Sequence, residues 1–140
     1  MIVEACVANP EEALKAQSKG AGRVELNSRL DLDGLTPVCT HIERSLNLLE
    51  IPVKVMIRPR GGHFMYNEND LIQMLADIEF CKEAGVQEVV LGATVPGSQL
   101  DLAALQRLSA AARPMNVCVH KAIDVCTDPV LEAKRLSRMD

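Results

Sequence analysis

The chain has 140 residues, of which 48% are hydrophobic and 24% are charged, and its net charge is −4 at pH 7. This composition is typical of one globular domain, and the lack of a basic stripe interleaved with aromatic residues, only 2% of the chain, argues against nucleic-acid binding. No apolar run approaches the roughly 20 residues of a membrane helix, and the N-terminus does not resemble a signal peptide, so we expect no membrane partner and a cytoplasmic location.

Strand and helix patterns alternate along the sequence. Asn9 and Pro10 are suited to open the first helix, which Gly20 ends, and Gly85 closes a long third helix. We expect strands at 2–6, 23–27, 53–58, 88–92 and 116–120. We expect helices from 10 to the glycine at 20, then at 37–50, 68–84 and 101–112, with a fifth that begins near 127–129 and is still running at the end of the chain.

The repeating unit is therefore one strand and one helix, which predicts parallel strands joined by right-handed crossovers. Five such units suit either a doubly wound sheet or the first five units of a (β/α)8 barrel. Side chains alternate along a strand, so residues two apart share a face. On four of the strands this face carries polar or ionisable side chains, which we expect to lie at the C-terminal ends of the strands (Glu4 and Cys6; Arg23, Glu25 and Asn27; Lys54, Met56 and Arg58; Cys118 and His120). Buried unpaired charge is costly, so this pattern favours the open mouth of a barrel.

The stretch "MIRPRGG", from Met56 to Gly62, ends the third strand with two arginines and two glycines. Arginine binds carboxylate or phosphate through two parallel hydrogen bonds, and glycine lets the backbone approach a ligand closely. We interpret Arg58, Arg60, Gly61 and Gly62 as an anion-binding segment. The alternative is that Arg58 pairs with Glu25 or Glu4 and only holds the mouth together.

Three further sets of residues are candidates for chemistry. Glu4, Arg23 and Glu25 can divide acid and base roles between two carboxylates, or form only a salt-bridge network. His120, at the end of the fifth strand, can be a general base or a metal ligand, or a hydrogen-bonded wall residue, and Asp124 can orient it or cap a turn. Phe64 and Tyr66 can form a lid over a ligand, or Phe64 can simply pack its loop down.

The chain has five cysteines, and no two have the Cys-x-x-Cys spacing of a zinc site or redox dithiol. We expect free thiols, as in the cytosol. Cys6, at the mouth end of the first strand, is the best single candidate for a Cu(I) ligand because Cu(I) favours soft sulfur donors.

The sequence resembles the CutC family, named for copper homeostasis, over its whole length. The resemblance rests on five stretches in matching order (Glu4-Ala-Cys6, Arg23-Val-Glu-Leu26, Gly34-Leu-Thr-Pro37, "MIRPRGG" with Phe64 and Tyr66, and His120-Lys-Ala-Ile-Asp124). It implies a TIM barrel of eight strands, so that residues 1–140 would be a single CutC-like domain, incomplete after Asp140. An open five-strand piece would expose two strand edges, from which we expect a homo-oligomer.

The resemblance also implies copper as a partner or cofactor, but with one departure from the family pattern. In the family, the proposed copper pair includes a second cysteine just after the strand-two Arg-x-Glu-Leu, and here that position is Asn27, a poor Cu(I) ligand. Cys118 and His120 share a face and could substitute. Two functions stay open: copper binding in copper homeostasis, or a barrel enzyme or binding protein for a small anionic or polar molecule. A third interpretation is that so short a chain has no activity.

Overall fold

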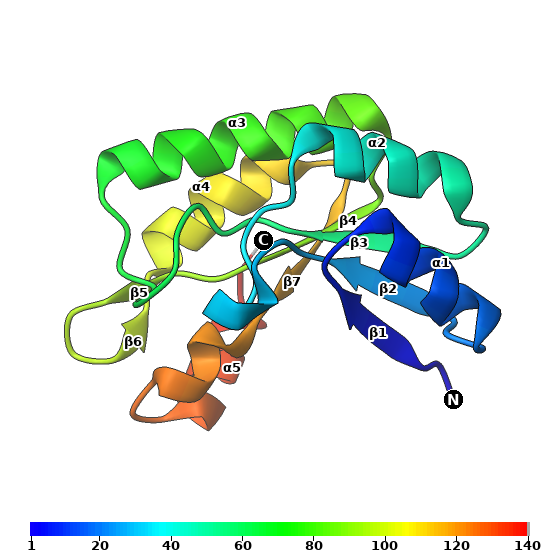
Figure 1. The fold of residues 1–140 in the computed structure, drawn as a ribbon. Coiled ribbons are helices and arrows are strands. Elements are labelled where there is room, and N and C mark those ends of the chain that lie inside the picture. Colours follow the sequence, from blue (N-terminus) through cyan, green and yellow to red (C-terminus); the bar gives the residue numbers. More distant parts are fainter. Residues whose placement is uncertain (140) are drawn as a thin grey trace.

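Five parallel strands form one curved sheet in the order β1-β2-β3-β4-β7 in this computed structural model, which describes residues 1–139 (Figure 1). The strands are β1 (Glu4–Val7), β2 (Arg23–Leu26), β3 (Val53–Met56), β4 (Glu88–Leu91) and β7 (Asn116–Val119). The helices are α1 (Pro10–Ser18), α2 (Cys39–Leu48), α3 (Glu68–Ala84), α4 (Leu102–Ala112) and α5 (Pro129–Leu136). Short 3-10 helices η1 (Leu30–Leu32) and η2 (Lys121–Val125) and a hairpin of β5 (Thr94–Val95) and β6 (Gln99–Leu100) complete the fold.

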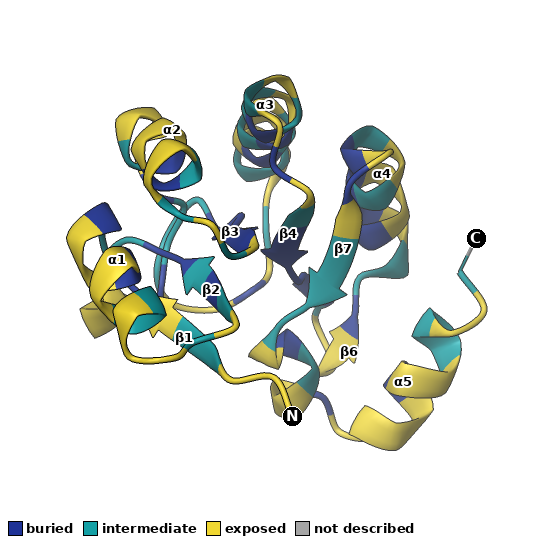
Figure 2. Ribbon diagram, turned by 90° about the vertical axis from the view of Figure 1, so that its right-hand side faces the viewer, coloured by how far each residue is buried: buried dark blue, intermediate teal, exposed yellow. Residues whose placement is uncertain are grey.

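Helices α1 to α4 form an arc on the convex face of the sheet, and the concave face is left open (Figure 2). A doubly wound sheet carries helices on both faces, whereas a barrel wall carries them only on the outside. The strands also follow chain order from one edge to the other. The prediction of a TIM-type barrel limited to five βα units is therefore confirmed.

The hydrophobic core lies between the convex face and its helices. Alternate strand residues point outward and are fully buried there, as are the helix residues that meet them (Val24, Leu26, Val55, Val89 and Leu91 against Ala13, Ile42, Met74, Ile78 and Leu108). The intervening strand residues point to the concave face. This alternation is what places the polar side chains of every strand on one inner surface.

Helix starts follow the expected capping chemistry. Asn9 accepts a hydrogen bond from the backbone N–H of Glu12 at 2.8 Å, and Asn67 and Asp70 form a reciprocal capping box on α3. Asp101 and Asp128 cap α4 and α5 in the same way. The fifth helix ends at Leu136, whereas we expected it to run to the end of the chain, and Asp140 lies outside the described residues.

Several boundaries differ from prediction; β1, for example, begins at Glu4 and ends at Val7, whereas we expected residues 2–6. Two of the differences have local reasons. β3 ends at Met56, two residues early, because the backbone N–H of Arg58 donates to Thr36 Oγ1 instead of joining the ladder. α2 begins at Cys39, because Val38 is still extended. Within residues 1–139, no helix combines the length and the apolar composition that a bilayer crossing needs.

Candidate functional site

A cavity of about 390 Å³ lies on the concave face, toward the carboxyl ends of the strands. Side chains from β1, β2, β3, β4 and β7 line it (Cys6, Glu25, Met56, Val90 and Cys118), together with residues just beyond the strand ends (Asn27, Arg58, Phe64, His120 and Lys121). A larger hollow of about 700 Å³ adjoins it and shares Asp33, Arg58, Phe64 and Lys121. We call the two together the mouth cavity.

Glu4 and Arg23 do not lie at this mouth, so their predicted position was wrong. Each is the first residue of its strand, at the opposite end of the sheet. There Arg23 pairs with Glu4, and the buried Lys54 Nζ lies 3.2 Å from Glu4 Oε2 and 2.7 Å from Glu88 Oε1. Burial acts to lower the pKa of Lys54, but its hydrogen bonds to Glu88 and Glu4 raise it overall. These four residues form a salt-bridge network, the floor network.

Arg58 is only 2% exposed, and its guanidinium group is held by backbone carbonyls. Nη1 donates to the carbonyl oxygens of Leu32 at 2.8 Å and Gly34 at 3.1 Å, and Nη2 donates to that of Gly62 at 2.8 Å. Neither Glu25 nor Glu4 pairs with it, so the alternative ion pair is not formed. Among residues 1–139 no carboxylate lies within 4.0 Å of Arg58, and its Nε is buried without a partner.

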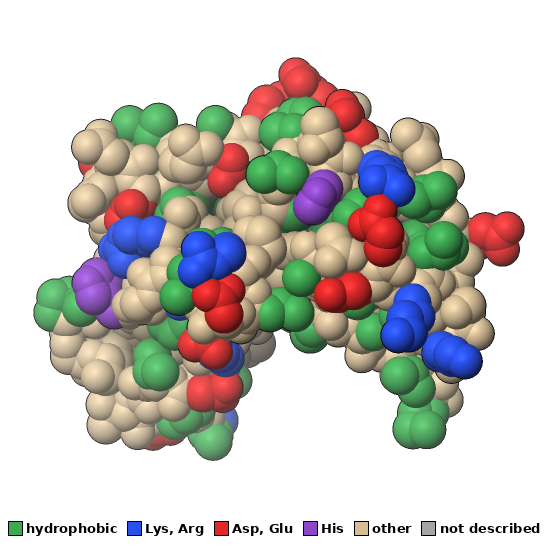
Figure 3. All heavy atoms as spheres, viewed as in Figure 1, with side chains coloured by type: hydrophobic (Ala, Val, Ile, Leu, Met, Phe, Trp, Pro, Cys, Tyr) green, Lys and Arg blue, Asp and Glu red, His purple; other side chains and the backbone are tan. Residues whose placement is uncertain are grey.

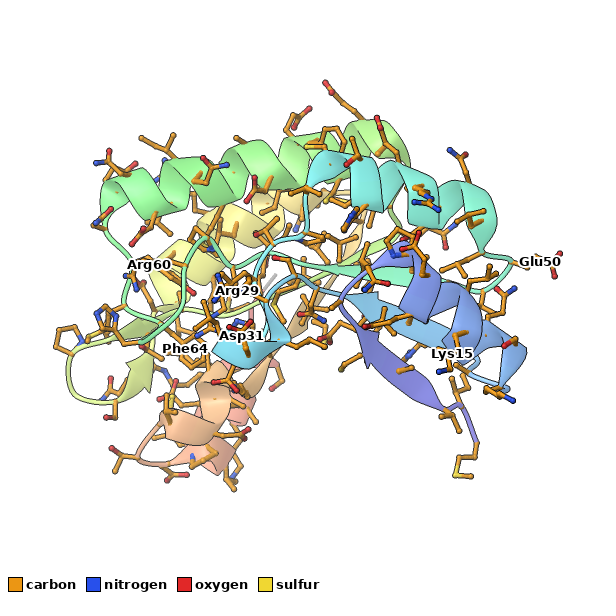
Figure 4. All side chains as sticks on the ribbon, in the orientation of Figure 1. Lys15, Arg29, Asp31, Glu50, Arg60 and Phe64 are labelled. Carbon is orange, nitrogen blue, oxygen red and sulfur yellow. The ribbon has the colours of Figure 1, made fainter. Side chains whose placement is uncertain are left out.

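Arg60 faces away from the mouth cavity and lines neither part of it. Its Nε and Nη2 contact Asp70 at 3.0 and 2.9 Å, and Nη2 also donates to the carbonyl of Met65 at 2.6 Å. Figure 4 shows Arg60 and Phe64 on the same loop, at the end of the molecule where the β5–β6 hairpin lies. The structure therefore gives Arg60 a bracing role and does not place it in an anion site.

The two glycines after Arg60 have different surroundings. A Cβ atom at Gly61 would meet Leu32 at ordinary contact distance. Gly62 has a φ of +82°, which favours glycine, and it lines the larger part of the mouth cavity. Of the predicted anion segment, only Arg58 and Gly62 face the cavity.

His120 is oriented by the backbone and not by Asp124. Its Nδ1 accepts a hydrogen bond from the N–H of Ala122 at 3.1 Å, so His120 itself caps η2. Its Nε2 is buried and has no partner in the described chain. Burial, and then the charge of Arg58, lower the pKa of His120 to about 4. Asp124 lines only the larger part of the cavity and makes no hydrogen bond or ion pair with His120.

Phe64 forms a wall of the cavity, not a lid. It is buried, its ring lies 5.0 Å from the ring of His120, and the guanidinium carbon of Arg58 lies 4.8 Å from its centroid. Tyr66 instead packs under Arg60, at 5.2 Å. The packing alternative for Phe64 was the correct one.

Glu25 lies in the smaller part of the cavity beside Cys6 and Asn27. Asn27 Nδ2 donates to Glu25 Oε1 at 3.3 Å, and Cys6 Sγ contacts the same oxygen at 3.7 Å. Burial, and then the charge of Glu25, raise the pKa of the Cys6 thiol. Burial also raises the pKa of Cys118. Both thiols are therefore protonated at neutral pH.

No cluster of three or more His, Cys, Asp or Glu side chains able to hold a metal ion occurs within residues 1–139. The soft donors Cys6, Met56 and Cys118 nevertheless line the same cavity. They come from three different strands, and Asn27 occupies the position where a second cysteine was expected from the resemblance.

The sequence analysis did not predict the ion pair between Lys121 and Asp33 at the mouth. Lys121 Nζ lies 2.8 Å from Asp33 Oδ1, which joins η2 to the loop after β2. Asp33 has a φ of +67°, and the Asp-Gly pair at 33–34 was the available turn signal. Lys121 lies 88 positions after Asp33, and no local sequence pattern predicts a pairing over that separation.

Comparison with known proteins gives one consistent family. A profile of the CutC family matches residues 1–139. A CutC family protein of Histophilus somni is 42% identical over 129 residues, which are 92% of this chain and 53% of the relative. One of Vibrio atlanticus is 41% identical over 128 residues, 90% of this chain and 52% of the relative. The chain thus spans about half the length of the curated relatives it matches.

Solved structures support the same fold. A protein of Streptococcus agalactiae, named for copper homeostasis and CutC, has a TM-score of 0.91 at 32% identity, with 97% of this chain and 68% of that chain covered. A phosphonopyruvate hydrolase in complex with oxalate and Mg²⁺ has a TM-score of 0.63 at 16% identity, with 98% of this chain and 53% of that chain covered. At that identity, the second likeness concerns the fold alone.

Proposed function

This chain belongs to the CutC family, whose members carry a name that refers to copper homeostasis, and we propose that its mouth cavity binds a small anionic or polar molecule. The observation that carries the proposal is the buried guanidinium group of Arg58, which lines both parts of the cavity without a carboxylate partner. A buried charge without a partner is costly, and a bound anion would compensate it.

The other charged groups of the cavity define the ligand further. Lys121 lines both parts and is half-exposed, so it can reach an anion while it stays close to Asp33. Glu25 lies in the smaller part, where its carboxylate can accept from a hydroxyl or amine. A ligand with an acidic group and a hydrogen-bond donor fits this arrangement. An enzyme activity of this cavity would use Glu25, Arg58, His120 and Asp124, which line it, while Glu4 and Arg23 pair at the opposite end of the sheet.

Titration calorimetry with acetate and with inorganic phosphate tests this proposal. We expect weak saturable binding that Lys121→Met weakens about threefold to tenfold, since a partly exposed charge contributes on the order of 1 kcal/mol. Lys19→Met, on the C-cap of α1, is the matched control and should leave binding unchanged. Equal affinities for both variants and the unsubstituted chain would exclude the mouth cavity as the anion site.

Copper is the second candidate ligand, supported by the family name and by the soft donors Cys6, Met56 and Cys118 in the same cavity. Cu(I) favours thiolate and thioether ligands. The raised thiol pKa values and the amide of Asn27 oppose tight binding, so we rank copper below the anion.

An anaerobic Cu(I) titration against a competing chelator tests whether the mouth cavity also binds copper. Copper binding predicts one equivalent that is lost in Cys6→Ser and kept in Cys39→Ser, whose cysteine is exposed on α2. Binding that is absent, or equal in both variants, would eliminate a copper site in the mouth cavity.

We also propose that residues 1–140 form a single domain of a cytoplasmic protein, since all five cysteines are free thiols.

A further inference from the structure

We infer that His120 Nε2–H and Arg58 Nε–H form a donor pair that receives an oxygen atom of the ligand, so that His120 acts as a neutral hydrogen-bond donor and not as a base or metal ligand. This inference rests on the proposed function and assigns the ligand chemistry of the same cavity. It follows from the burial of these two nitrogen atoms and from their lack of hydrogen-bond partners in the described chain.

The hydrogen bond at Nδ1 determines which nitrogen of His120 carries the proton. The backbone N–H of Ala122 donates to Nδ1 at 3.1 Å, and a backbone amide can only donate, so Nδ1 must hold a lone pair. In a neutral imidazole the proton is then on Nε2. Nε2–H is a donor, and a ring nitrogen that carries a proton cannot take another proton or bind a metal ion.

Close packing holds the ring in this orientation. A Cβ atom at Gly92 would lie only 2.5 Å from Cε1 and Nδ1 of His120, so the ring fills the space that the missing side chain leaves. Phe64 packs against the ring at a centroid distance of 5.0 Å. The ring is therefore fixed between β4, the loop after β3 and its own backbone cap.

Arg58 Nε is the second donor without a partner. The three hydrogen bonds of Arg58 to backbone carbonyls come from Nη1 and Nη2, which leaves Nε–H unpaired although the side chain is 98% buried. Arg58 and His120 contact the same Phe64 ring and line the same part of the cavity. The two side chains that carry these donors thus belong to one wall of the smaller part of the mouth cavity.

An unpaired buried donor costs roughly 1–3 kcal/mol, and native chains hold few of them. Neither nitrogen has exposed surface, so a ligand oxygen supplies the missing partner only when side chains in the wall of the cavity move. The pair carries one positive charge, from Arg58, beside one neutral N–H. This combination suits a carboxylate or phosphate oxygen, and acetate and inorganic phosphate are the probes that distinguish these two sources.

The tautomer is measured first, without any ligand, by two-bond ¹H–¹⁵N correlation NMR of the imidazole rings. The chain has three histidines, and the His120 signals are those missing in His120→Gln. We expect a protonated Nε2 and an unprotonated Nδ1 at pH 7. A protonated Nδ1, or rapid exchange between the two forms, would overturn this inference while leaving anion binding by Arg58 and Lys121 intact.

Titration with acetate and with phosphate follows. We expect one of them to shift His120 Nε2–H and to bind about tenfold more weakly to His120→Leu, which has no donor. His120→Gln should bind within about threefold of the unsubstituted chain, because its side-chain amide can donate from the position of Nε2. Binding that is equal in the Leu and Gln variants would overturn the donor pair. No shift of His120 Nε2–H while a probe binds would overturn this inference alone, whereas no binding of either probe would overturn both this inference and the proposed function.

Discussion

Arg58 and Arg60 are two residues apart, yet they serve different parts of the molecule. Arg58 is buried and binds three backbone carbonyls of the loops after β2 and β3, whereas Arg60 is partly exposed and pairs with Asp70 on α3. Alternation along an extended chain predicts that both arginines share a face. The chain leaves the strand at Met56, however, and this turn separates them.

Replacement of these two arginines should affect stability unequally. Arg58→Met leaves the carbonyl oxygens of Leu32, Gly34 and Gly62 without their donor, so we expect the free energy of unfolding to fall by about 3 kcal/mol. Arg60→Met removes a partly exposed ion pair and should cost about 1 kcal/mol. Urea denaturation measures both. Equal losses would contradict the assigned roles.

The low pKa of His120 predicts a pH dependence of stability. The folded pKa, about 4, lies below the ordinary value of 6.5, so the unfolded chain binds the proton more tightly. The free energy of unfolding should therefore fall as the pH drops from 6.5 to 4, by up to about 3 kcal/mol from this group. Urea denaturation across this range, with His120→Gln as the control, should show a shallower slope in the variant. Identical slopes would mean that His120 is not held neutral.

Gly92 gives a third test at the residue scale. Gly92→Ala places a methyl group 2.5 Å from the His120 ring and 2.8 Å from Ala122 Cβ, and we expect a loss of about 1–3 kcal/mol in thermal or urea unfolding. Gly61→Ala is the control, since its Cβ would meet nothing closer than 3.5 Å and its backbone does not require glycine. A Gly92→Ala protein as stable as the control would show that the ring moves freely.

Much of the mouth could be predicted from alternation alone. Cys6, Glu25, Arg58 and His120 were expected on one face, and all four line the smaller part of the cavity. Glu4 and Arg23 share that face, but they begin their strands, and face alternation carries no information on which end of a strand a residue occupies. The turn of the chain at Arg58 depends on Thr36, which lies 22 residues away, so no local pattern reveals it.

Among the secondary-structure elements, strong capping signals predicted helix boundaries correctly. The third helix was predicted at 68–84 and is found there, because Asn67 and Asp70 cap its start and Gly85, with φ +86°, ends it. The β5–β6 hairpin was missed because each strand has two residues, too few for a period of two to be visible. It nevertheless forms one wall of the larger part of the mouth cavity.

The floor network joins four strands, and its removal can be tested as a unit. Lys54→Met leaves Glu88 without its cation and leaves Glu4 paired with Arg23 alone, so we expect a loss of about 3 kcal/mol in urea unfolding. Neutralising both acids as well, in Glu4→Gln/Lys54→Met/Glu88→Gln, should recover part of this loss, because Arg23, the network charge then left without its partner, is partly exposed. A triple variant less stable than Lys54→Met would show that the acids contribute independently of the lysine.

The whole molecule is an open barrel wall with two free edges. Within residues 1–139, β1 pairs only with β2, and β7 pairs only with β4. Figure 3 shows a hollow between the lobe of η2 and α5 and the N-terminal strand, and basic and acidic side chains are interspersed on this face. Free edges favour pairing with further strands, and mixed charge gives no broad basic surface for nucleic acid.

We therefore expect the chain of residues 1–140 to associate through its free edges. Light scattering coupled to size-exclusion chromatography should give a mass of at least twice 15.3 kDa that rises with protein concentration. A constant mass of 15.3 kDa up to about 100 µM would contradict association and imply that the edges are protected in solution.

Mapping where an anion binds tests the proposed role of the mouth cavity most directly. Amide ¹H–¹⁵N spectra of the unsubstituted chain, recorded during titration with inorganic phosphate and then acetate, need no substitution that endangers folding. We expect the largest shifts on Arg58, Gly62, His120 and Lys121, which surround the mouth cavity. Shifts confined to the exposed cations of α1 and α5, or no shifts at all, would contradict anion binding in the mouth cavity.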